Sequence, residues 1–279
     1  MIDRRMLLAG GGAALGLGLW RARGIAAEPL DFGLAGALSQ GGWARGIAPQ
    51  GVRALSLSGN PVDVARDGRF FIAFDRDSAA SLELSARLAD GRQLSRLVKV
   101  APRAWQIERI PIGPKPGTPP SEAYARLRSG ELDQINAARS IDHPVEGWRQ
   151  KFIWPVYGRI SGRFGSQRIY NGVPGSYHSG LDIATGASGT PFVAPADGIV
   201  TLAAESPFSL EGKLLMIDHG MGLNSAFLHC SAHAVTVGDT VRQGQFIANI
   251  GKTGRATGPH LHWSIKWRSF RLDPLLFVT

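Results

Sequence analysis

The sequence predicts a mainly β protein with an N-terminal small β-sandwich, a connecting helix and a C-terminal antiparallel β-sheet domain. Three observations lead to this fold class. The chain has 36 glycines and 17 prolines among 279 residues, which is typical of a fold with many turns. Short segments that alternate apolar and polar residues recur along most of it. Only one segment, after residue 120, has helical periodicity over several turns.

Length and composition describe an ordinary globular protein. The hydrophobic content is 44% and the charged content is 19%, which excludes a disordered chain. A length of 279 residues suits two modest domains. Cys230 is the single cysteine, so no intrachain disulfide can form. We therefore expect the fold to depend on core burial, on a bound metal, or on both.

The first 27 residues have the pattern of an export signal. Arg4 and Arg5 give a positive start, Met6–Trp20 is an apolar run, and small residues follow at Gly24–Ala27. The paired arginines resemble a twin-arginine signal. We expect the protein to be exported to the periplasm or cell envelope, with no stable membrane span once the signal is cleaved. Retention of residues 1–27 as an uncleaved anchor is the alternative.

The formal net charge of the chain is +9, and residues 1–27 contribute +3 of it, so the remainder carries +6. A mildly basic exported protein is attracted to anionic polymers of the envelope or to membrane surfaces. A basic surface that only maintains solubility explains the charge equally well. No basic stripe interleaved with aromatic residues is present, so we expect no nucleic-acid partner.

Residues 28–112 predict the small β-sandwich. Four segments alternate apolar and polar residues between glycine, aspartate and asparagine: VRALSLSG, GRFFIAFD, SLELSARLADG and LSRLVKVA. No cluster of histidine and carboxylate residues lies among them. We interpret this region as a folding or spacing domain, with cell-wall binding or covering of an active site as alternatives.

Residues 113–149 predict a linker and a helix. The sequence GPKPGTPP, at 113–120, is a stiff proline-rich connector. Ser121 is a favourable N-cap for a helix over about 122–138. Its apolar residues, at roughly helical spacing, are Ala123, Leu127, Leu132 and Ile135. We expect this helix to pack on one of the two domains.

Residues 150–279 read as strands and tight turns, and they contain three separated clusters of histidines. The clusters are Tyr177–Ile183, Phe227–His229 and Pro259–Trp263. Two imidazoles and a carboxylate from distant strands can form an open zinc site that leaves a coordination position for water. The isolated histidines, which are His143, His219 and His233, we interpret as ordinary surface or core residues.

His260 and His262 are one residue apart, so in a strand their side chains lie on the same face. Leu261, Trp263 and Ile265 would then face a core. A pair of this kind can hold a metal, act on a proton, or do both. Cys230 directly follows His229, and neighbours in a strand point to opposite faces. We therefore interpret Cys230 as a buried apolar residue and not as a nucleophile.

Two of the clusters resemble a known family. HSGLD, residues 178–182, is similar to the His-x-x-x-Asp motif of the lysostaphin-like (LytM-type) zinc metallopeptidases. TGRATGPHLHW, residues 253–263, is similar to their His-x-His motif with its glycine-rich approach. The connecting sequences 180–200 and 235–251 also look like strands of that family. The resemblance covers about residues 150–275 and marks 150–279 as a zinc metallopeptidase domain.

The resemblance implies a role for five residues. His178, Asp182 and His262 would bind one Zn²⁺, and His229 and His260 would be the catalytic pair beside the bound water. Which of the two histidines is the base stays open. The chain departs from the family at Cys230, where leucine is frequent.

The resemblance implies an exported zinc endopeptidase that hydrolyses peptide cross-links of bacterial peptidoglycan. We expect it to act as a monomer on peptidoglycan peptides. Zinc lowers the pKa of bound water to about 7. An imidazole, with a reference pKa of about 6.5, can take a proton from that water and deliver it to the leaving amine. The bond that is cut, and whether the wall is the organism's own, stay open.

Two other functions fit parts of the sequence. A non-catalytic member of the same fold could bind and activate another cell-wall hydrolase, although such members have lost metal ligands that are all present here. The segment VTVGDTVRQGQFIANIG resembles hairpins of biotin- or lipoyl-carrier domains. Lys252 lacks the neighbours that such domains use, so we interpret this similarity as structural only.

Overall fold

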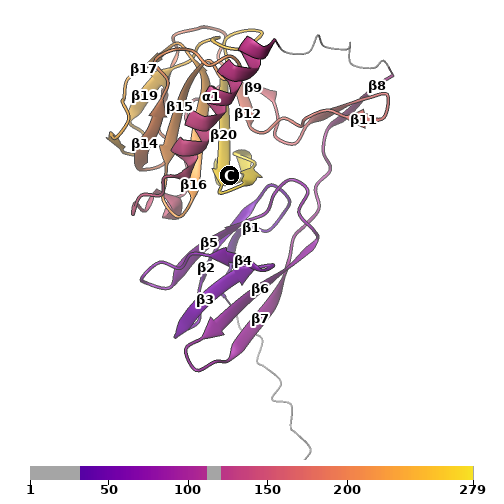
Figure 1. Cartoon of the computed structure of the whole chain (residues 1–279), viewed down its shortest axis with the longest axis vertical. Coiled ribbons are helices and arrows are strands. Elements are labelled where there is room, and N and C mark those ends of the chain that lie inside the picture. The colour runs from indigo at the N-terminus through magenta and orange to yellow at the C-terminus, as the bar shows by residue number, and fades with distance from the viewer. Residues whose placement is uncertain (1–31, 112–120, 279) are drawn as a thin grey trace, which may run out of the picture.

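The computed structural model describes residues 32–111 and 121–278, and it is mainly β, as predicted (Figure 1). The predicted signal segment 1–27 and the proline-rich connector 113–120 lie outside these residues. Strands form five sheets within the described ranges. Among these residues, no helix has the length and apolar character needed to span a membrane.

The N-terminal region contains two sheets. One has the order β1-β2-β5 and the other β4-β3-β6-β7. Their bounds are β1 Ala35–Ala37, β2 Trp43–Ile47, β3 Val52–Leu57, β4 Asn60–Val62, β5 Arg69–Ala73, β6 Ser81–Leu88 and β7 Gln93–Lys99. Alternate residues of β6 are buried, as their apolar and polar alternation requires. Leu55, Phe70 and Leu84, from both sheets, share one buried cluster, so the two sheets pack as a sandwich.

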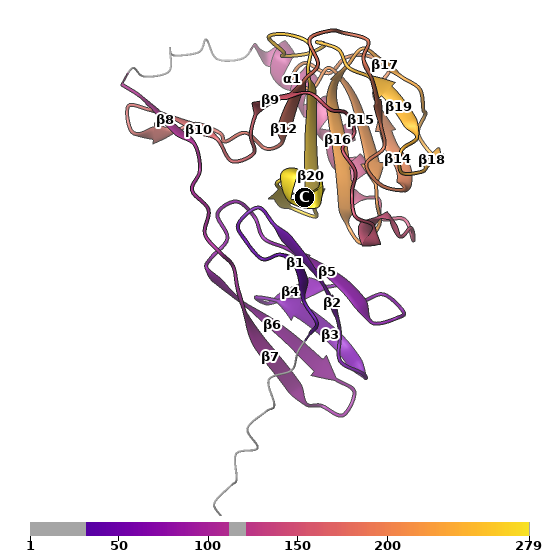
Figure 2. The same cartoon turned by 180° about the vertical axis from the view of Figure 1, so that it is seen from behind.

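A small three-stranded unit connects the N-terminal region to the C-terminal region. Strand β8 (Ile107–Ile110) pairs in parallel with β10 (Gln167–Tyr170), which pairs antiparallel with β11 (Val173–Pro174). Both views show this unit projecting from the side of the molecule (Figures 1 and 2). The strand that leaves the sandwich is therefore hydrogen-bonded to the C-terminal region.

The single long helix, α1 (Glu122–Ser140), is two residues longer than predicted. The Ser121 Oγ accepts a hydrogen bond from the Tyr124 backbone N–H at 3.2 Å, so Ser121 is its N-cap as expected. Ile135 and Ala138 are buried, but Leu127 and Leu132 are 56% and 41% exposed. Only the second half of the helix therefore packs closely on a sheet.

The C-terminal region is built on a sheet of eight strands in which every pair is antiparallel. Its order is β18-β14-β15-β16-β20-β12-β9, with β21 paired to β20. Its strands are β9 Arg159–Gly162, β12 Leu181–Ala184, β14 Gly198–Ala203, β15 Lys213–Asp218, β16 Leu223–Cys230, β18 Thr240–Val241, β20 Leu261–Trp267 and β21 Phe270–Leu272. A second sheet combines β13 (Pro191–Val193), β19 (Phe246–Asn249) and β17 (Ala232–His233). Two short helices, η1 (Gly147–Arg149) and α2 (Leu275–Val278), complete the region.

The two faces of the large sheet have different neighbours. Leu261, Trp263 and Ile265 are fully buried in the main core, on the face predicted from their alternation along the strand. The opposite face carries Met216, Ala226 and Leu228, and these residues pack with Ile135 and Ala138 of α1. Figure 1 shows α1 lying across that face. Helix α1 therefore lies on the side of the sheet that also carries His262.

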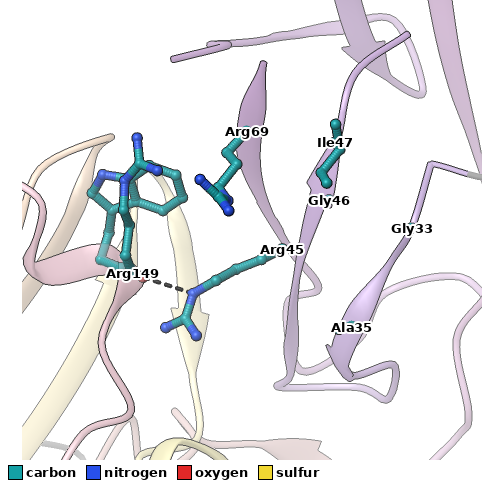
Figure 3. A pocket seen from close by; sticks show the side chains of 8 residues that line it. Gly33, Ala35, Arg45, Gly46, Ile47, Arg69 and Arg149 are labelled. Carbon is teal, nitrogen blue, oxygen red and sulfur yellow. Dashed lines mark hydrogen bonds between the residues drawn. The ribbon is translucent and has the colours of Figure 1, made fainter. Parts of the chain in front are cut away.

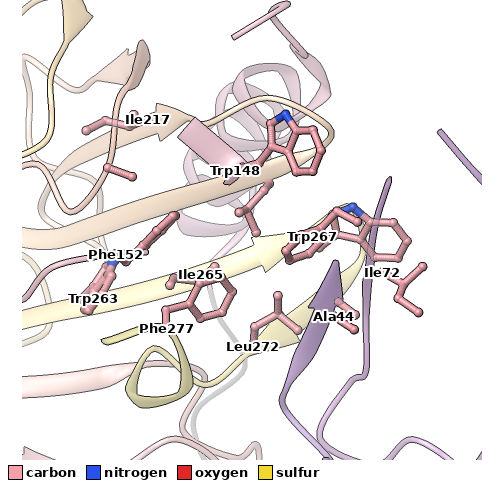
Figure 4. Packing of buried hydrophobic residues seen from close by; sticks show 14 of the residues in the cluster. Ala44, Ile72, Trp148, Phe152, Ile217, Trp263, Ile265, Trp267, Leu272 and Phe277 are labelled. Carbon is pink, nitrogen blue, oxygen red and sulfur yellow. The ribbon is translucent and has the colours of Figure 1, made fainter. Parts of the chain in front are cut away.

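One aromatic core joins the sandwich to the C-terminal sheet. The Trp43 ring lies 5.9 Å from the Phe71 ring and 5.1 Å from the Phe277 ring, and Phe71 lies 6.0 Å from Trp267. The Trp43 indole N–H also donates to the backbone carbonyl of Leu276 at 3.0 Å. Figure 4 shows Ala44 and Ile72 of the sandwich beside buried side chains of β20 and β21, among them Trp267 and Leu272. The sandwich is therefore packed directly on the C-terminal region.

Polar contacts surround this aromatic core. Arg103 bonds the buried Asp273 at 2.7 Å. A hollow of about 400 Å³ between the two parts is lined by Arg45, Arg69 and Arg149 (Figure 3). Arg45 donates to the backbone carbonyls of Trp148 and Gln150, while Arg69 and Arg149 both bond Asp67. Arg45 and Arg149 therefore connect the two parts, whereas Arg69 bonds within the sandwich.

His219 lies in the core of the C-terminal region as a neutral imidazole. Its Nδ1 lies 2.7 Å from the Asp197 carbonyl oxygen, its Nε2 lies 2.8 Å from the Ser225 Oγ, and its ring packs edge-on against Phe152. Burial lowers its pKa to about 4. His219 is thus a structural residue, in agreement with the interpretation from sequence.

We expect His219 to make the fold sensitive to acid. The unfolded chain has a histidine pKa of about 6.5, so between about pH 6.5 and 4 it binds a proton that the folded chain does not. The free energy of unfolding should therefore fall by about 3 kcal/mol through this window as the pH decreases. Urea denaturation of the metal-free protein at several pH values measures the change. A His219→Gln variant with the same pH dependence as the wild type would contradict this assignment.

Candidate metal centre

The strand register of β12 and β20 brings two candidate ligands together. Asp182 is paired with His262 across the two antiparallel strands, so their side chains lie on the same face. The His262 Nδ1 lies 2.8 Å from the Asp182 Oδ1. The third candidate, His178, precedes β12, and its Nε2 lies 3.0 Å from the same Oδ1 and 3.1 Å from the His262 Nδ1. Three potential ligand atoms thus face one point.

Backbone contacts fix the orientation of His178. Its N–H donates to the Ser166 carbonyl at 2.8 Å, and its Nδ1 lies 3.1 Å from the Arg163 carbonyl oxygen. A proton on Nδ1 satisfies that carbonyl and leaves the lone pair of Nε2 directed at Asp182. A second hydrogen bond of this kind is usual for a metal-binding histidine.

Two glycines allow the ligands to approach one another. A Cβ at Gly180 would lie 2.7 Å from the His262 Nε2 and 2.5 Å from the Trp263 carbonyl oxygen. A Cβ at Gly162 would lie 2.3 Å from the Asp182 Oδ2. Any side chain at either position would displace a ligand. The packing of the site therefore requires a glycine in the HSGLD motif, and the spacing of the motif alone does not reveal this requirement.

The electrostatics of the group favour a carboxylate between two imidazoles. Burial tends to raise the pKa of Asp182, but hydrogen bonds from His178 and His262 outweigh it and hold the pKa well below its usual range. Burial disfavours protonation of both histidines. For His178 the hydrogen bond and charge of Asp182 prevail and raise the pKa, whereas for the more buried His262 burial prevails and lowers it.

His229 and His260 lie beside this group. Their ring centroids are 4.9 Å apart, and the His229 ring lies 6.3 Å from that of His262. The His260 Nε2 lies 3.8 Å from the Asp182 Oδ1. The Nδ1 of His229 lies 2.8 Å from the Thr253 carbonyl oxygen and that of His260 lies 2.9 Å from the Gly258 carbonyl oxygen. A proton on each Nδ1 satisfies these carbonyls and leaves each Nε2 free for chemistry.

The backbone of His229 has a φ of +65°, in the left-handed region. Few non-glycine residues adopt it, and histidine is among those found there more often. This conformation interrupts the regular alternation at the end of β16. Burial also lowers the pKa of His229, mainly by removing water, so the imidazole is neutral at neutral pH.

Thr253 is a positioning residue that the sequence analysis did not identify. Its carbonyl accepts from His229, its Oγ1 accepts from the Lys213 backbone N–H at 2.8 Å, and it donates to the Cys230 carbonyl at 2.9 Å. It therefore ties the loop before His260 to the strand end that carries His229. Its position at the start of the TGRATG segment was the sequence signal that could have identified it.

Cys230 is fully buried, and burial raises its thiol pKa to about 12. This agrees with the prediction that it is a packing residue, because a thiol of such high pKa is a poor nucleophile near neutral pH. Its Sγ lies 3.6 Å from the Phe227 carbonyl oxygen.

The structure brings all five predicted site residues together. Within residues 32–111 and 121–278, His178, Asp182 and His262 form the one group of histidine and acidic side chains arranged to hold a metal ion. The roles of ligand and catalytic residue remain predictions. His143 lies elsewhere, with its Nδ1 2.9 Å from Asp218. His233 lies in β17, outside the large sheet.

Comparison with known proteins identifies the sequence that builds this centre. The sequence model of Peptidase family M23 matches residues 176–274. This segment contains the four histidines and the aspartate of the candidate site. The chain contains a peptidase family M23 domain. This confirms the resemblance to LytM-type metallopeptidases found in the motifs.

Curated relatives match the M23 domain and its immediate surroundings. The DD-carboxypeptidase/endopeptidase Mpg of Neisseria meningitidis is 36% identical over 120 residues, which are 43% of this chain and 27% of that protein. The peptidoglycan DD-endopeptidase ShyB of Vibrio cholerae is 37% identical over 131 residues, 47% of this chain and 26% of that protein. The murein hydrolase activator NlpD of Salmonella dublin is 31% identical over 142 residues, which are 51% of this chain and 34% of that protein. The chain thus spans between a quarter and about a third of these relatives.

One solved structure extends the similarity beyond the M23 domain. A Pseudomonas aeruginosa protein assigned to peptidase M23 is 27% identical, with a TM-score of 0.65. The match covers 86% of this chain and 94% of that one. The similarity in fold therefore extends over most of the chain, beyond the segment that matches the M23 family.

We expect Gly180→Ala to weaken metal binding without unfolding the M23 domain. The new methyl group would press on the His262 imidazole and turn it away from Asp182, with a loss of roughly 10- to 100-fold in metal affinity. Metal titration of the purified variant measures the affinity, and circular dichroism checks the fold. Gly130→Ala is a matched control, because a Cβ there meets open space and neither glycine has a positive φ. Unchanged affinity in Gly180→Ala would argue against His262 as a ligand.

Proposed function

We propose that the protein is an exported zinc-dependent endopeptidase that hydrolyses peptide cross-links of bacterial peptidoglycan. One observation carries the proposal: His178, Asp182 and His262 converge on one point, with His229 and His260 beside it. Membership in peptidase family M23 and similarity to relatives named peptidoglycan DD-endopeptidases support it.

The donor set fits zinc. Two imidazole nitrogens and one carboxylate oxygen are a usual protein ligand set for catalytic Zn²⁺. A tetrahedral zinc with bonds of 2.0–2.1 Å has ligand atoms about 3.3 Å apart. The three donor atoms lie 2.8–3.1 Å from one another, slightly inside that spacing. Small side-chain rotations would therefore suffice to hold the ion.

The chain's own residues supply proton transfer and charge stabilisation. Zinc, when bound, acts as a Lewis acid and makes a water molecule a stronger nucleophile. The Nε2 of a neutral His229 or His260 can accept a proton from the attacking water and return it to the leaving amine. The other imidazole, when it carries a proton on Nε2 as well as on Nδ1, can donate a hydrogen bond to the oxyanion of the tetrahedral intermediate. The carbonyls of Thr253 and Gly258 keep both Nε2 atoms available.

Residues 1–27 and the charge support an envelope location. The proposed signal would export the protein, and the remaining net charge of +6 favours anionic wall polymers. The names of two relatives, a peptidoglycan DD-endopeptidase and a murein hydrolase activator, refer to the bacterial cell wall. We propose the periplasm or cell envelope as the site of action.

A second candidate is a non-enzymatic activator of another cell-wall hydrolase. The similarity to NlpD, named as a murein hydrolase activator, favours it. The complete set of ligands and both additional histidines favours the enzyme, because binding alone does not require them. The two functions differ in whether they require His229: hydrolysis needs its imidazole, whereas activation of another hydrolase by binding does not.

We expect His229→Ala to retain zinc and to lose peptidoglycan hydrolysis by at least about 100-fold, since an acid–base group contributes about 10²- to 10⁴-fold. His178→Ala should lose both zinc and activity, because two ligands hold the ion poorly. His143→Asn, outside the centre, should retain both. Zinc content by atomic emission and release of soluble muropeptides by mass spectrometry give the readouts.

Chelation should abolish hydrolysis, and added zinc should restore it. A wild-type protein that binds zinc yet releases no muropeptides, while it stimulates another hydrolase, would favour the activator function. A His260→Ala variant that lost its zinc would overturn the assignment of His260 as a catalytic residue outside the ligand set.

A further inference from the structure

A basic hollow adjoins the metal centre on the α1 side of the sheet. It has a volume of about 270 Å³, and His262 lines it. Four cations also line it, Arg128 and Arg139 of α1, Lys266 of β20 and Arg271 of β21, together with the carboxylate of Glu211. Lys266 is four residues beyond His262 along β20, so both side chains lie on the same face of the sheet.

Arg128 is paired with Glu211 and Glu131, whereas Arg139, Lys266 and Arg271 form no ion pair with a carboxylate among the described residues. The buried Nε–H of Arg139 donates to no acceptor in the part of the chain that the structure describes. The nearest opposing charges are already engaged. Glu211 forms two bonds to Arg128, at 2.6 and 2.8 Å. Asp75 accepts from the Tyr177 hydroxyl and from the Arg271 backbone N–H.

The positive charges also repel one another. Burial is the main cause that lowers the pKa of Lys266 to about 8, and the charges of Arg139 and Arg271 lower it further. The charge of Asp75 raises this pKa, but its effect is the smallest of the four. Burial and the charge of Arg271 lower the pKa of Arg139 to about 10, with Glu211 opposing. Arg139 and Lys266 are partly buried, and Arg271 is exposed. Cations that repel one another in this way are stabilised when an anion binds between them.

The position of the hollow indicates what kind of anion it would take. A second hollow, of about 210 Å³, lies beyond Asp182 and His260 and includes Arg159. The metal ligands thus lie between two hollows, and a peptide that crosses the centre would reach into both. A group in the basic hollow would belong to a residue close to the scissile bond.

We propose that Arg139, Lys266 and Arg271 bind a free carboxylate of the peptide substrate, on a residue close to the bond that is cut. This rests on the proposed peptidase function and adds a specificity for substrate charge. The guanidinium groups offer paired donors that match the two oxygens of a carboxylate. Helix α1 would accordingly be a wall of the substrate site.

Two substrates test the proposal: a purified cross-linked stem-peptide dimer with free carboxylates, and the same dimer with those carboxylates converted to carboxamides. The zinc-loaded wild-type protein should cleave the free acid with roughly 10- to 100-fold higher kcat/KM, because a hydrogen bond between charged groups is much stronger than a neutral one. Arg139→Gln and Lys266→Gln should raise KM for the free acid and leave kinetics on the amide unchanged.

Matched variants separate charge from folding. Arg139→Lys keeps the charge and should retain most of the preference. Arg126→Gln, on the exposed side of α1 where Arg126 pairs with Glu122, should behave as wild type. Equal rates of the wild type on acid and amide would overturn the proposal. Variants at Arg139 that accelerate cleavage of both substrates would overturn it too, and would make α1 a lid over the site.

Binding measured without turnover keeps this test separate from that of the proposed function. Calorimetry with the zinc-loaded His229→Ala variant should show tighter binding of the free acid than of the amide, and the difference should disappear on adding Lys266→Gln. If the wild type cleaves neither dimer, the peptidase function fails, while this binding difference still decides whether the hollow takes a carboxylate.

Discussion

The metal centre depends on the register between β12 and β20. Asp182 lies directly across from His262, and His262 lies across from Leu228 on β16. A slip of one residue would turn the ligands of one strand to the opposite face of the sheet, into the core. The buried residues Leu181, Leu261 and Trp263 oppose such a slip, since it would expose them. The apolar core on one face thus maintains the ligand geometry on the other.

Contacts outside the sheet complete the site. His178 and His260 lie beside strands, and backbone carbonyls orient their rings. Helix α1 is held near the centre by a network in which the buried Glu131 accepts from Ser209 and Arg128, and Arg128 also binds Glu211. The Glu211 carbonyl accepts from the His229 N–H at 2.8 Å. The segment that fastens the helix is therefore also bonded to a residue beside the metal ligands.

The sequence was sufficient to predict the parts that follow local rules. Alternation predicted the mainly β fold and the buried face of β20, and Ser121 predicted the start of α1. The motifs predicted which side chains would meet at the centre. Long-range packing was not predictable: no local pattern indicates that Trp43 contacts Phe277, or that Ile107 pairs with Gln167. Nor does spacing disclose that Gly180 must lack a side chain, since that depends on the His262 ring beside it.

The aromatic core shared by the sandwich and the C-terminal sheet has a practical consequence for dissecting the protein. A recombinant fragment that began at residue 150 would leave Trp267 and Phe277 without Trp43 and Phe71, and it would leave the buried Asp273 without Arg103. Such a fragment would expose a large apolar patch to water and would tend to self-associate. Biochemistry on the isolated C-terminal region would then report on a damaged surface as well as on its chemistry.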